Sequence, residues 1–305
     1  MSPTFDRKAT ARIPASTTNL GPGFDVLGLA LQLYSTVTLE PSETDTKVIV
    51  SGVDADKIPS TPAHVAFQAV ELVFHRSGAE RPKGFKLQIE NGIPAIRGLG
   101  GSGTAILGGL LTANALCGNP FSNPELLNFA TELEGHPDNV AASLYGGLVV
   151  SAQEDAQVHT VRLECPPLLS IVLAIPDFPL STEQARRVLP TSVGFADAIY
   201  NTSRSTLLIA SIATRQFEML RVAMKDRLHQ PYRASLIPGF DDVAEAATTA
   251  GALSVALSGA GPTVAAYCLE RTEQVAEKMQ GAFKKHQIVT DIKILKPDAR
   301  GATVF

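Results

Sequence analysis

The chain has 305 residues, of which 45% are hydrophobic and 18% are charged, and its net charge is −4. This length and apolar fraction suit one large domain or two modest ones with a sizeable core, and the negative charge argues against a general nucleic-acid-binding surface. No uninterrupted apolar run reaches the roughly 20 residues of a membrane helix. The charges at Asp6, Arg7 and Lys8 are not followed by an apolar stretch of signal-peptide length. We therefore expect a cytoplasmic protein that binds neither nucleic acid nor membrane.

The first half of the chain alternates short strands with helices. Apolar spacing ended by Gly78 predicts an amphipathic helix over residues 62–77, and His64 at its start is expected to be a surface residue. Further helices are expected at 105–116 and 124–133. Strands are expected at 9–13, 32–40, 47–51 and 85–89, and a hairpin at 146–151 and 158–163.

Two prolines interrupt the pattern at 164–167, and we place a domain boundary there, giving domains of residues 1–165 and 166–305. The second domain is predicted to have strands at 169–175, 252–257, 263–267 and 289–295, and helices at 183–189, 195–213, 216–228, 240–250 and 272–285. The order strand, helices, strand, strand, helix, strand is that of the ferredoxin-like split βαβ fold. The whole chain is therefore predicted to be α+β.

The chain contains three widely spaced cysteines, Cys117, Cys165 and Cys268. This number and spacing indicate neither a disulfide framework nor a zinc site. All three lie in apolar stretches, so we expect buried thiols in a reducing compartment.

A glycine-rich stretch at residues 93–104 precedes the uncharged apolar run at 105–116. It contains four glycines, a serine and a threonine within seven positions: Gly98, Gly100, Gly101, Ser102, Gly103 and Thr104. Glycine permits positive φ and close approach of a ligand to the backbone, and the first N–H groups of a helix are free and lie at its positive end. The pattern predicts an anion site, most often one for phosphate, although a purely structural glycine turn has the same composition.

Two common phosphate loops fit this stretch poorly. Gly98, Gly100 and Gly103 match the dinucleotide pattern G-x-G-x-x-G, but that loop directly follows a strand and opens a βαβ unit. Here a proline-containing segment separates the loop from the strand at 85–89, and a second helix follows where a strand should be. The spacing also fits a P-loop, but Thr104 stands where the lysine belongs.

Four segments, taken in order, resemble the GHMP small-molecule kinases: residues 19–25, 94–102, 134–139 and 258–263. The family's ATP loop is proline, three residues and Gly-Leu-Gly-Ser-Ser, and Pro94-Ala-Ile-Arg-Gly-Leu-Gly-Gly-Ser102 matches it except that Gly101 replaces the first serine. Residues 14–28 and His136-Pro-Asp-Asn-Val140 resemble the homoserine kinase branch of the family. The resemblance covers almost the whole chain.

The resemblance implies a two-domain fold, with an N-terminal part like domain 2 of ribosomal protein S5 and a C-terminal ferredoxin-like sandwich. It also implies ATP and Mg²⁺ as cofactors. Ser102 would place a hydroxyl near the metal, Glu132 is the first choice for its carboxylate ligand, and Glu134 is a close competitor. The residues expected to wrap the triphosphate are Pro94, Ala95, Ile96, Arg97, Gly98, Leu99, Gly100, Gly101, Ser102, Gly103 and Thr104.

The acceptor implied by the resemblance is an amino acid, which presents a carboxylate and an ammonium group. Arginine recognises a carboxylate through a planar pair of donors, and Arg186 and Arg233 match the family pattern. The expected substrate-binding residues are Asn19, Asp25, His136, Asn139, Arg186 and Arg233, and the expected catalytic residues are Asn19, Asp25, Asp138, Asn139 and Thr182.

The function implied is ATP-dependent phosphorylation of the side-chain hydroxyl of L-homoserine, in threonine biosynthesis. One alternative is a GHMP kinase that acts on mevalonate or a sugar. Another is a non-catalytic nucleotide-binding regulator, which the missing serine at Gly101 would favour. A homodimer would fit the family, although no interface can be read from the sequence.

Overall fold

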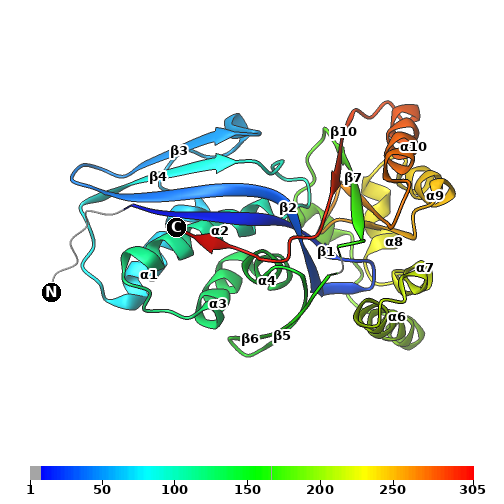
Figure 1. Cartoon of the computed structure of the whole chain (residues 1–305), viewed down its shortest axis with the longest axis horizontal. Helices are drawn as coiled ribbons and strands as arrows, with labels where there is room; N and C mark the ends of the chain where they lie inside the picture. The colour runs from blue at the N-terminus through cyan, green and yellow to red at the C-terminus, as the bar shows by residue number, and fades with distance from the viewer. Residues whose placement is uncertain (1–7, 166) are drawn as a thin grey trace.

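The computed structural model describes residues 8–165 and 167–305, and two β-sheets organise it (Figure 1). The first sheet has seven strands, in the order β11-β1-β2-β4-β3, with β5 paired to β2 and β6 paired to β5. Its strands are β1 (Ala9–Asn19), β2 (Gly23–Ser42), β3 (Lys47–Gly52), β4 (Gly84–Asn91), β5 (Leu148–Glu154), β6 (Gln157–Leu163) and β11 (Thr303–Val304).

The long strand β2 joins the two ends of this sheet. Its first part pairs with β5 through residues 27–29, and its second part pairs with β4 through residues 36–42. Strand β4 alternates buried and exposed residues, with Leu87 and Ile89 inward and Gln88 outward. This alternation places one face of the sheet against helices and leaves the other face to water.

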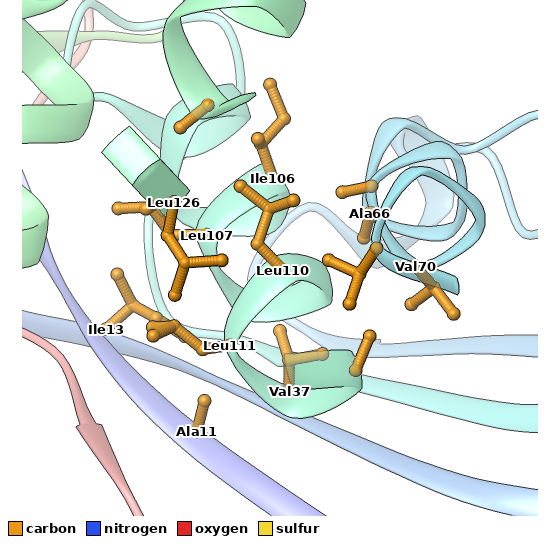
Figure 2. Close-up of a cluster of buried hydrophobic side chains, with 14 of the residues drawn as sticks. Ala11, Ile13, Val37, Ala66, Val70, Ile106, Leu107, Leu110, Leu111 and Leu126 are labelled. Atoms are coloured by element: carbon orange, nitrogen blue, oxygen red, sulfur yellow. The ribbon is translucent and has the colours of Figure 1, made fainter. Parts of the chain in front are cut away.

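Four helices cover the buried face (Figure 1): α1 (Val65–Ser77), α2 (Gly101–Leu116), α3 (Asn123–Glu134) and α4 (Asp138–Tyr145). Helix α2 is the central one, and Figure 2 shows Leu110 on the side of α2 toward Ala66 of α1 and Leu111 on the side toward Ile13 of the sheet. A Cβ at Gly109 would lie 2.0 Å from the Ala66 carbonyl oxygen, so this glycine lets α1 approach closely. Because α2 is enclosed by neighbours, its sequence lacks charge.

The second sheet has four antiparallel strands in the order β10-β7-β9-β8. The strands are β7 (Ser170–Pro176), β8 (Ser254–Leu257), β9 (Val264–Cys268) and β10 (Thr290–Leu295). The helical segments of this half are α5 (Thr182–Arg187), α6 (Phe195–Ala213), η2 (Phe217–Met219), α7 (Leu220–Ala223), α8 (Gln230–Arg233), η3 (Ala234–Leu236), α9 (Phe240–Ala250) and α10 (Thr272–Lys285). This strand order is the ferredoxin-like one that the sequence predicts.

Strand β7 is buried along its whole length because both of its faces are covered. Val172 and Ala174 pack against α9 and α10. Ile171 and Leu173 face the opposite way, into a core shared with α6, α7 and the first sheet. This shared core fixes the two sheets against each other.

The single long helix predicted at residues 216–228 is wrong, because η2 and α7 are short and α7 ends at Ala223. The helix does not continue to residue 228 because the Asp226 carboxylate accepts hydrogen bonds from the main-chain N–H groups of residues 228–230. An aspartate that bonds to nearby main-chain groups competes with the helix.

The final residues of the chain return to the first sheet. Strand β11 pairs with β1, and Leu31 forms an isolated bridge with Pro297. Residues 297–305 therefore pack with the first unit, although the sequence places them in the second domain. The domain boundary near residue 165 stays a prediction, and residue 166 lies outside the described residues. Among the described residues, no helix is long and apolar enough to cross a membrane.

Candidate active site

A cavity of about 420 Å³ is lined by residues from both halves of the chain. Its walls include residues from all four of the segments that the sequence analysis singled out, together with Thr182, Arg186 and Arg233. The fold therefore brings together residues that lie more than two hundred positions apart, such as Asn19 and Gly259, whose side-chain amide and carbonyl oxygen are 2.9 Å apart.

The glycine-rich stretch forms a loop that leads directly into α2. Gly98 and Gly100 have left-handed φ values of 74° and 73°, and α2 begins at Gly101. The first N–H groups of a helix lack intrahelical acceptors and lie at its positive end. Since Gly100, Gly101 and Ser102 line the cavity, the start of α2 presents an anion site there.

Close packing also requires two of these glycines. A Cβ at Gly98 would lie 2.1 Å from the Ser258 carbonyl oxygen, and one at Gly100 would lie 2.3 Å from Ser16 Oγ. Gly101 differs, because a Cβ there would meet only Ile93 Cγ2, at 3.9 Å. The loop therefore has room for a side chain at Gly101 but not at Gly98 or Gly100.

Not every expected loop residue faces the cavity. Pro94 and Gly103 are buried and do not line it. Leu99 is 1% exposed and packs into the core between the sheets, so only its main chain is available to a ligand. Thr104 donates its hydroxyl to the Gly101 carbonyl oxygen at 2.8 Å, and it therefore does not replace the hydroxyl that Gly101 lacks.

One end of the cavity is charged. Arg186 lies 2.9 Å from each carboxylate oxygen of Asp25. Asn19 accepts the Asp25 N–H at 3.0 Å and donates to the Gly259 carbonyl at 2.9 Å. Asn19 therefore holds the turn that presents Asp25, and both ends of its amide group already have protein partners.

Arg233 is 2% exposed and lies beneath this end of the cavity. It donates to the carbonyl oxygens of Ala185 and Gly259. Burial, together with the nearby Arg186, lowers its pKa to about 10. Both guanidinium groups lie over the ring of Phe24, at 4.9 Å for Arg233 and 5.3 Å for Arg186. Phe24 lies within the segment 19–25 but is not among the site residues predicted from the sequence.

The start of α4 supplies a third group of polar side chains. Asp138 is 1% exposed, and its carboxylate contacts His136 Nδ1 and the Asn139 N–H, each at 2.8 Å. Burial acts to lower the pKa of His136, but the hydrogen bond with Asp138 and the surrounding carboxylates raise it overall. Asn139 accepts a hydrogen bond from Ser16 Oγ at 2.9 Å. These side chains lie beside the glycine-rich loop, since Gly100 packs against Asn139.

Comparison with known proteins assigns the family. The family models described as the GHMP kinases N terminal domain and the GHMP kinases C terminal match residues 64–147 and 208–285. The homoserine kinase of Moorella thermoacetica is 46% identical over 96% of this chain and 99% of that protein. This chain belongs to the GHMP kinases.

Solved structures agree with the family assignment. The homoserine kinase of Cytophaga hutchinsonii has a TM-score of 0.88 at 29% identity, over 98% of this chain and 97% of that one. A mevalonate kinase has a TM-score of 0.69 at 15% identity, over 95% and 99% of the two chains, which shows the shared fold alone. The two-domain GHMP kinase fold expected from the sequence is confirmed.

The structure does not bring Glu132, the first choice for a metal ligand, to the site. Glu132 is exposed and forms an ion pair with Arg76 at 3.3 Å. Glu132 and Glu134 are two residues apart on α3, so their side chains point in directions about 200° apart around the helix axis. Glu132 points to water, and Glu134 lines the cavity. Burial raises the pKa of Glu134, against the effect of a hydrogen bond from Ser102. We correct the expected carboxylate ligand to Glu134 and retain its role in metal binding as a proposal.

The cavity residues of this GHMP kinase fit a magnesium–nucleotide complex. Ser102 and Glu134 offer a hydroxyl and a carboxylate oxygen beside the start of α2, and Mg²⁺ prefers oxygen ligands. Among the described residues, no group of three or more His, Cys, Asp or Glu side chains is placed to hold a metal. Mg²⁺ usually keeps several waters and binds substrate phosphates, so phosphate oxygens and water would supply the remaining ligands.

The expectation that His64 is a surface residue is wrong. His64 is 6% exposed and lines the cavity at the start of α1. Its Nδ1 accepts the Ala66 N–H at 3.0 Å, so the ring caps the helix, and burial lowers its pKa. The helix begins at Val65, later than the predicted residue 62, and His64 therefore occupies the N-cap position rather than the first turn.

Proposed function

We propose that this GHMP kinase transfers the γ-phosphoryl group of ATP to the side-chain hydroxyl of L-homoserine, giving O-phospho-L-homoserine for threonine biosynthesis. The observation that carries the proposal is the charge arrangement at one end of the cavity, where Asp25 lies beside Arg186 and above Arg233. The homoserine kinases of Moorella thermoacetica and Carboxydothermus hydrogenoformans, at 46% and 44% identity, support it.

The charges match an amino acid. Arg186 and Arg233 are suited to bind the substrate carboxylate through charge-assisted hydrogen bonds, and Asp25 is suited to bind the ammonium. The remaining end of homoserine, its hydroxyl, would then extend toward Asp138 and Asn139, which lie next to the glycine-rich loop. This orientation would bring the acceptor oxygen near the γ-phosphate.

Phosphoryl transfer depends mainly on positioning and charge stabilisation, because its transition state is loose. The N–H groups at the start of α2 would hold the phosphates, and Thr182 at the start of α5 would face the γ-phosphate. Ser102 and Glu134 would hold Mg²⁺, which supplies positive charge to the phosphate oxygens. Asp138 is the group best placed to receive the hydroxyl proton. Its hydrogen bond to His136 also supports a positioning role.

Three further parts of the proposal rest on the family resemblance. We propose ATP with Mg²⁺ as the donor complex, a cytoplasmic location and a homodimeric assembly. The location and the assembly do not change the chemistry argued from the cavity.

The two alternatives make different demands on the charged end of the cavity. Mevalonate carries a carboxylate without an ammonium, and a neutral sugar carries neither, so neither acceptor uses both Asp25 and the arginines. A non-catalytic regulator would need no acceptor site at all. The regulator hypothesis is supported by the missing serine at position 101. The main-chain N–H groups at the start of α2 are still available to phosphate there, so the loss of this serine does not remove the anion site.

The test is ADP release with ATP and Mg²⁺ across a panel of L-homoserine, D-homoserine, L-serine, L-threonine, mevalonate and galactose. We expect turnover with L-homoserine, far weaker turnover with the other amino acids, and none with mevalonate or galactose. Phosphorus NMR of the product would show a phosphate monoester on the side chain. Turnover with mevalonate or galactose alone would overturn the proposal, and ATP binding without any turnover would favour the regulator.

A further inference from the structure

We propose that Arg97 is a positioning residue that couples the phosphate loop to helix α5, and so sets the spacing between the ATP and acceptor sites. The inference rests on the proposed function, because α5 carries Thr182 and Arg186. Arg97 is a cation within a phosphate-binding loop, so its sequence position suggests direct contact with phosphate. Its side chain is instead directed mainly to main-chain carbonyl groups.

The guanidinium group of Arg97 forms a four-point clamp. Its Nε donates to the Pro176 carbonyl oxygen at 2.8 Å, and one terminal nitrogen donates to that of Asp177 at 2.8 Å. The other terminal nitrogen donates to Ala95 at 2.9 Å and to Ile96 at 3.4 Å. Arginine has five N–H donors in a rigid fork, so the protein's own main chain occupies most of them.

These contacts join the two halves of the site. Ala95 and Ile96 belong to the phosphate loop, while Pro176 ends strand β7 and Asp177 follows it. The chain then runs only a few residues before α5 begins at Thr182. Moving the clamp would therefore move the donor loop relative to the acceptor helix.

Two further hydrogen bonds connect the loop to the second half of the chain. The Leu180 N–H donates to the Ile96 carbonyl at 3.3 Å, beside the Arg97 clamp. Ser258 Oγ donates to the Gly98 carbonyl at 2.7 Å from the other side. Arg97 is the charged member of this set and is 6% exposed. Hydrogen bonds from a charged donor are stronger than neutral ones, and more so when they are buried.

A lysine cannot reproduce this clamp. Its ammonium is a single point on a flexible stem, whereas the guanidinium plane reaches acceptors in several directions. Arg97→Lys keeps the charge and loses the fork, and Arg97→Met loses both. If Arg97 acts by charge on the phosphates, lysine should restore much of the activity. If it acts by geometry, both variants should be impaired.

The matched control is Arg162, which makes the same kind of contact away from the cavity. Its Nε donates to the Tyr145 carbonyl at 3.0 Å, and a terminal nitrogen donates to that of Ala299 at 2.6 Å. Arg162→Met removes a main-chain clamp without touching the phosphate loop. Thermal unfolding of all variants reports whether each is folded.

The experiment measures steady-state kinetics and the affinity of a non-hydrolysable ATP analogue, with and without L-homoserine. We expect both Arg97 variants to lose about 10- to 100-fold in kcat, the scale of a small misplacement of reacting groups. We expect the analogue alone to bind within about threefold of wild type, and the mutual strengthening of the two ligands to fall about fivefold or more, within the usual range of site coupling. Arg162→Met should change none of these.

Three outcomes would overturn the inference. The first is kcat within twofold of wild type in folded Arg97→Met. The second is recovery of wild-type kcat in Arg97→Lys. The third is loss of analogue affinity while the coupling between the two ligands is unchanged. Either of these two results would assign Arg97 to contact with the phosphates. If Arg97→Met does not fold, Arg97→Lys decides by the same measurements. Absence of wild-type turnover with L-homoserine would instead reject the proposed function, and analogue binding would still report whether Arg97 serves the nucleotide.

Discussion

A single terminal nitrogen of Arg186 lies 2.9 Å from both carboxylate oxygens of Asp25, and this ion pair joins the second half of the chain to the first at the cavity. Both side chains are about one-third exposed. Exposed ion pairs contribute little to stability because water competes for the charges. A zwitterionic substrate can therefore exchange partners with this pair at small cost, its ammonium taking Asp25 and its carboxylate taking Arg186.

Asp25→Asn and Arg186→Ala should each raise the KM for homoserine by about 10- to 100-fold while leaving the KM for ATP within about threefold, because a hydrogen bond to a charged group contributes about 1.5–3 kcal/mol. Steady-state kinetics with each substrate varied in turn is the measurement. Arg187→Ala is the control, since Arg187 is exposed and pairs with Glu183. A rise in the KM for ATP, with homoserine kinetics unchanged, would assign Arg186 to the nucleotide.

Gly100→Val should abolish binding of an ATP analogue, whereas Gly101→Ser should bind it within about threefold of wild type. A side chain at Gly100 would clash with Ser16 and would have to adopt positive φ, which β-branched residues strongly disfavour. Gly101 has space for the added hydroxymethyl group. Titration calorimetry on variants of checked folding decides. Equal affinities for the two variants would mean that the loop does not hold the phosphates.

Glu134→Gln should raise the Mg²⁺ concentration needed for half-maximal activity by about tenfold or more, because it removes a charged ligand from the metal. Glu132→Gln should leave the Mg²⁺ dependence unchanged, since Glu132 is exposed and pairs with Arg76. A magnesium titration of both variants at saturating ATP separates the two glutamates. The reverse result would restore Glu132 as the ligand.

Asp138→Asn should lose less than about 10²-fold in kcat, the lower end of general-base contributions. The reason is that Asp138 already holds His136 and the Asn139 N–H, a positioning role that asparagine keeps in part. The measurement is kcat against pH for wild type and variant. A larger loss, together with disappearance of the acidic limb of the profile, would establish Asp138 as the base.

His229→Asn should flatten the acid dependence of stability. His229 is buried, its Nε2 lies 2.7 Å from the Gly21 carbonyl oxygen, and burial lowers its pKa from 6.5. The charged groups around it are Asp226, Arg233 and Asp25, and the first and third of these act to raise that pKa without overcoming burial. Below about pH 6.5 the unfolded chain therefore binds a proton that the folded chain refuses, so the free energy of unfolding falls as pH falls.

Urea unfolding of wild type and His229→Asn between pH 5 and 7.5 measures this effect. The slope of unfolding free energy with pH should decrease in the variant by at most one proton, or about 1.4 kcal/mol per pH unit. His159→Asn is the control, because His159 is exposed. Identical slopes in wild type and His229→Asn would show that His229 is not held neutral.

The sequence by itself determined the architecture and the position of the glycine-rich loop. The alternation of apolar and polar residues in β4 and the uncharged run of α2 are local patterns. Each pattern indicates which faces of the strand or helix are buried. The glycines at 98 and 100 identify the loop because only glycine accepts positive φ easily. The long motifs with fixed spacing then indicated the family, because each motif encodes a turn or a helix start that lines the cavity.

Only the tertiary structure decided which polar side chains reach the cavity. The sequence does not distinguish Glu132 from Glu134 as a metal ligand. The orientation of α3 about its axis exposes Glu132 to water and turns Glu134 toward the cavity. Arg97 belongs to the phosphate motif, yet its donors are used by main-chain carbonyl groups about 80 residues away. Asp226 ends a predicted helix by bonding to main-chain groups that follow it. In each case the partner of a polar side chain is set by packing between distant segments, and local sequence carries no record of that packing.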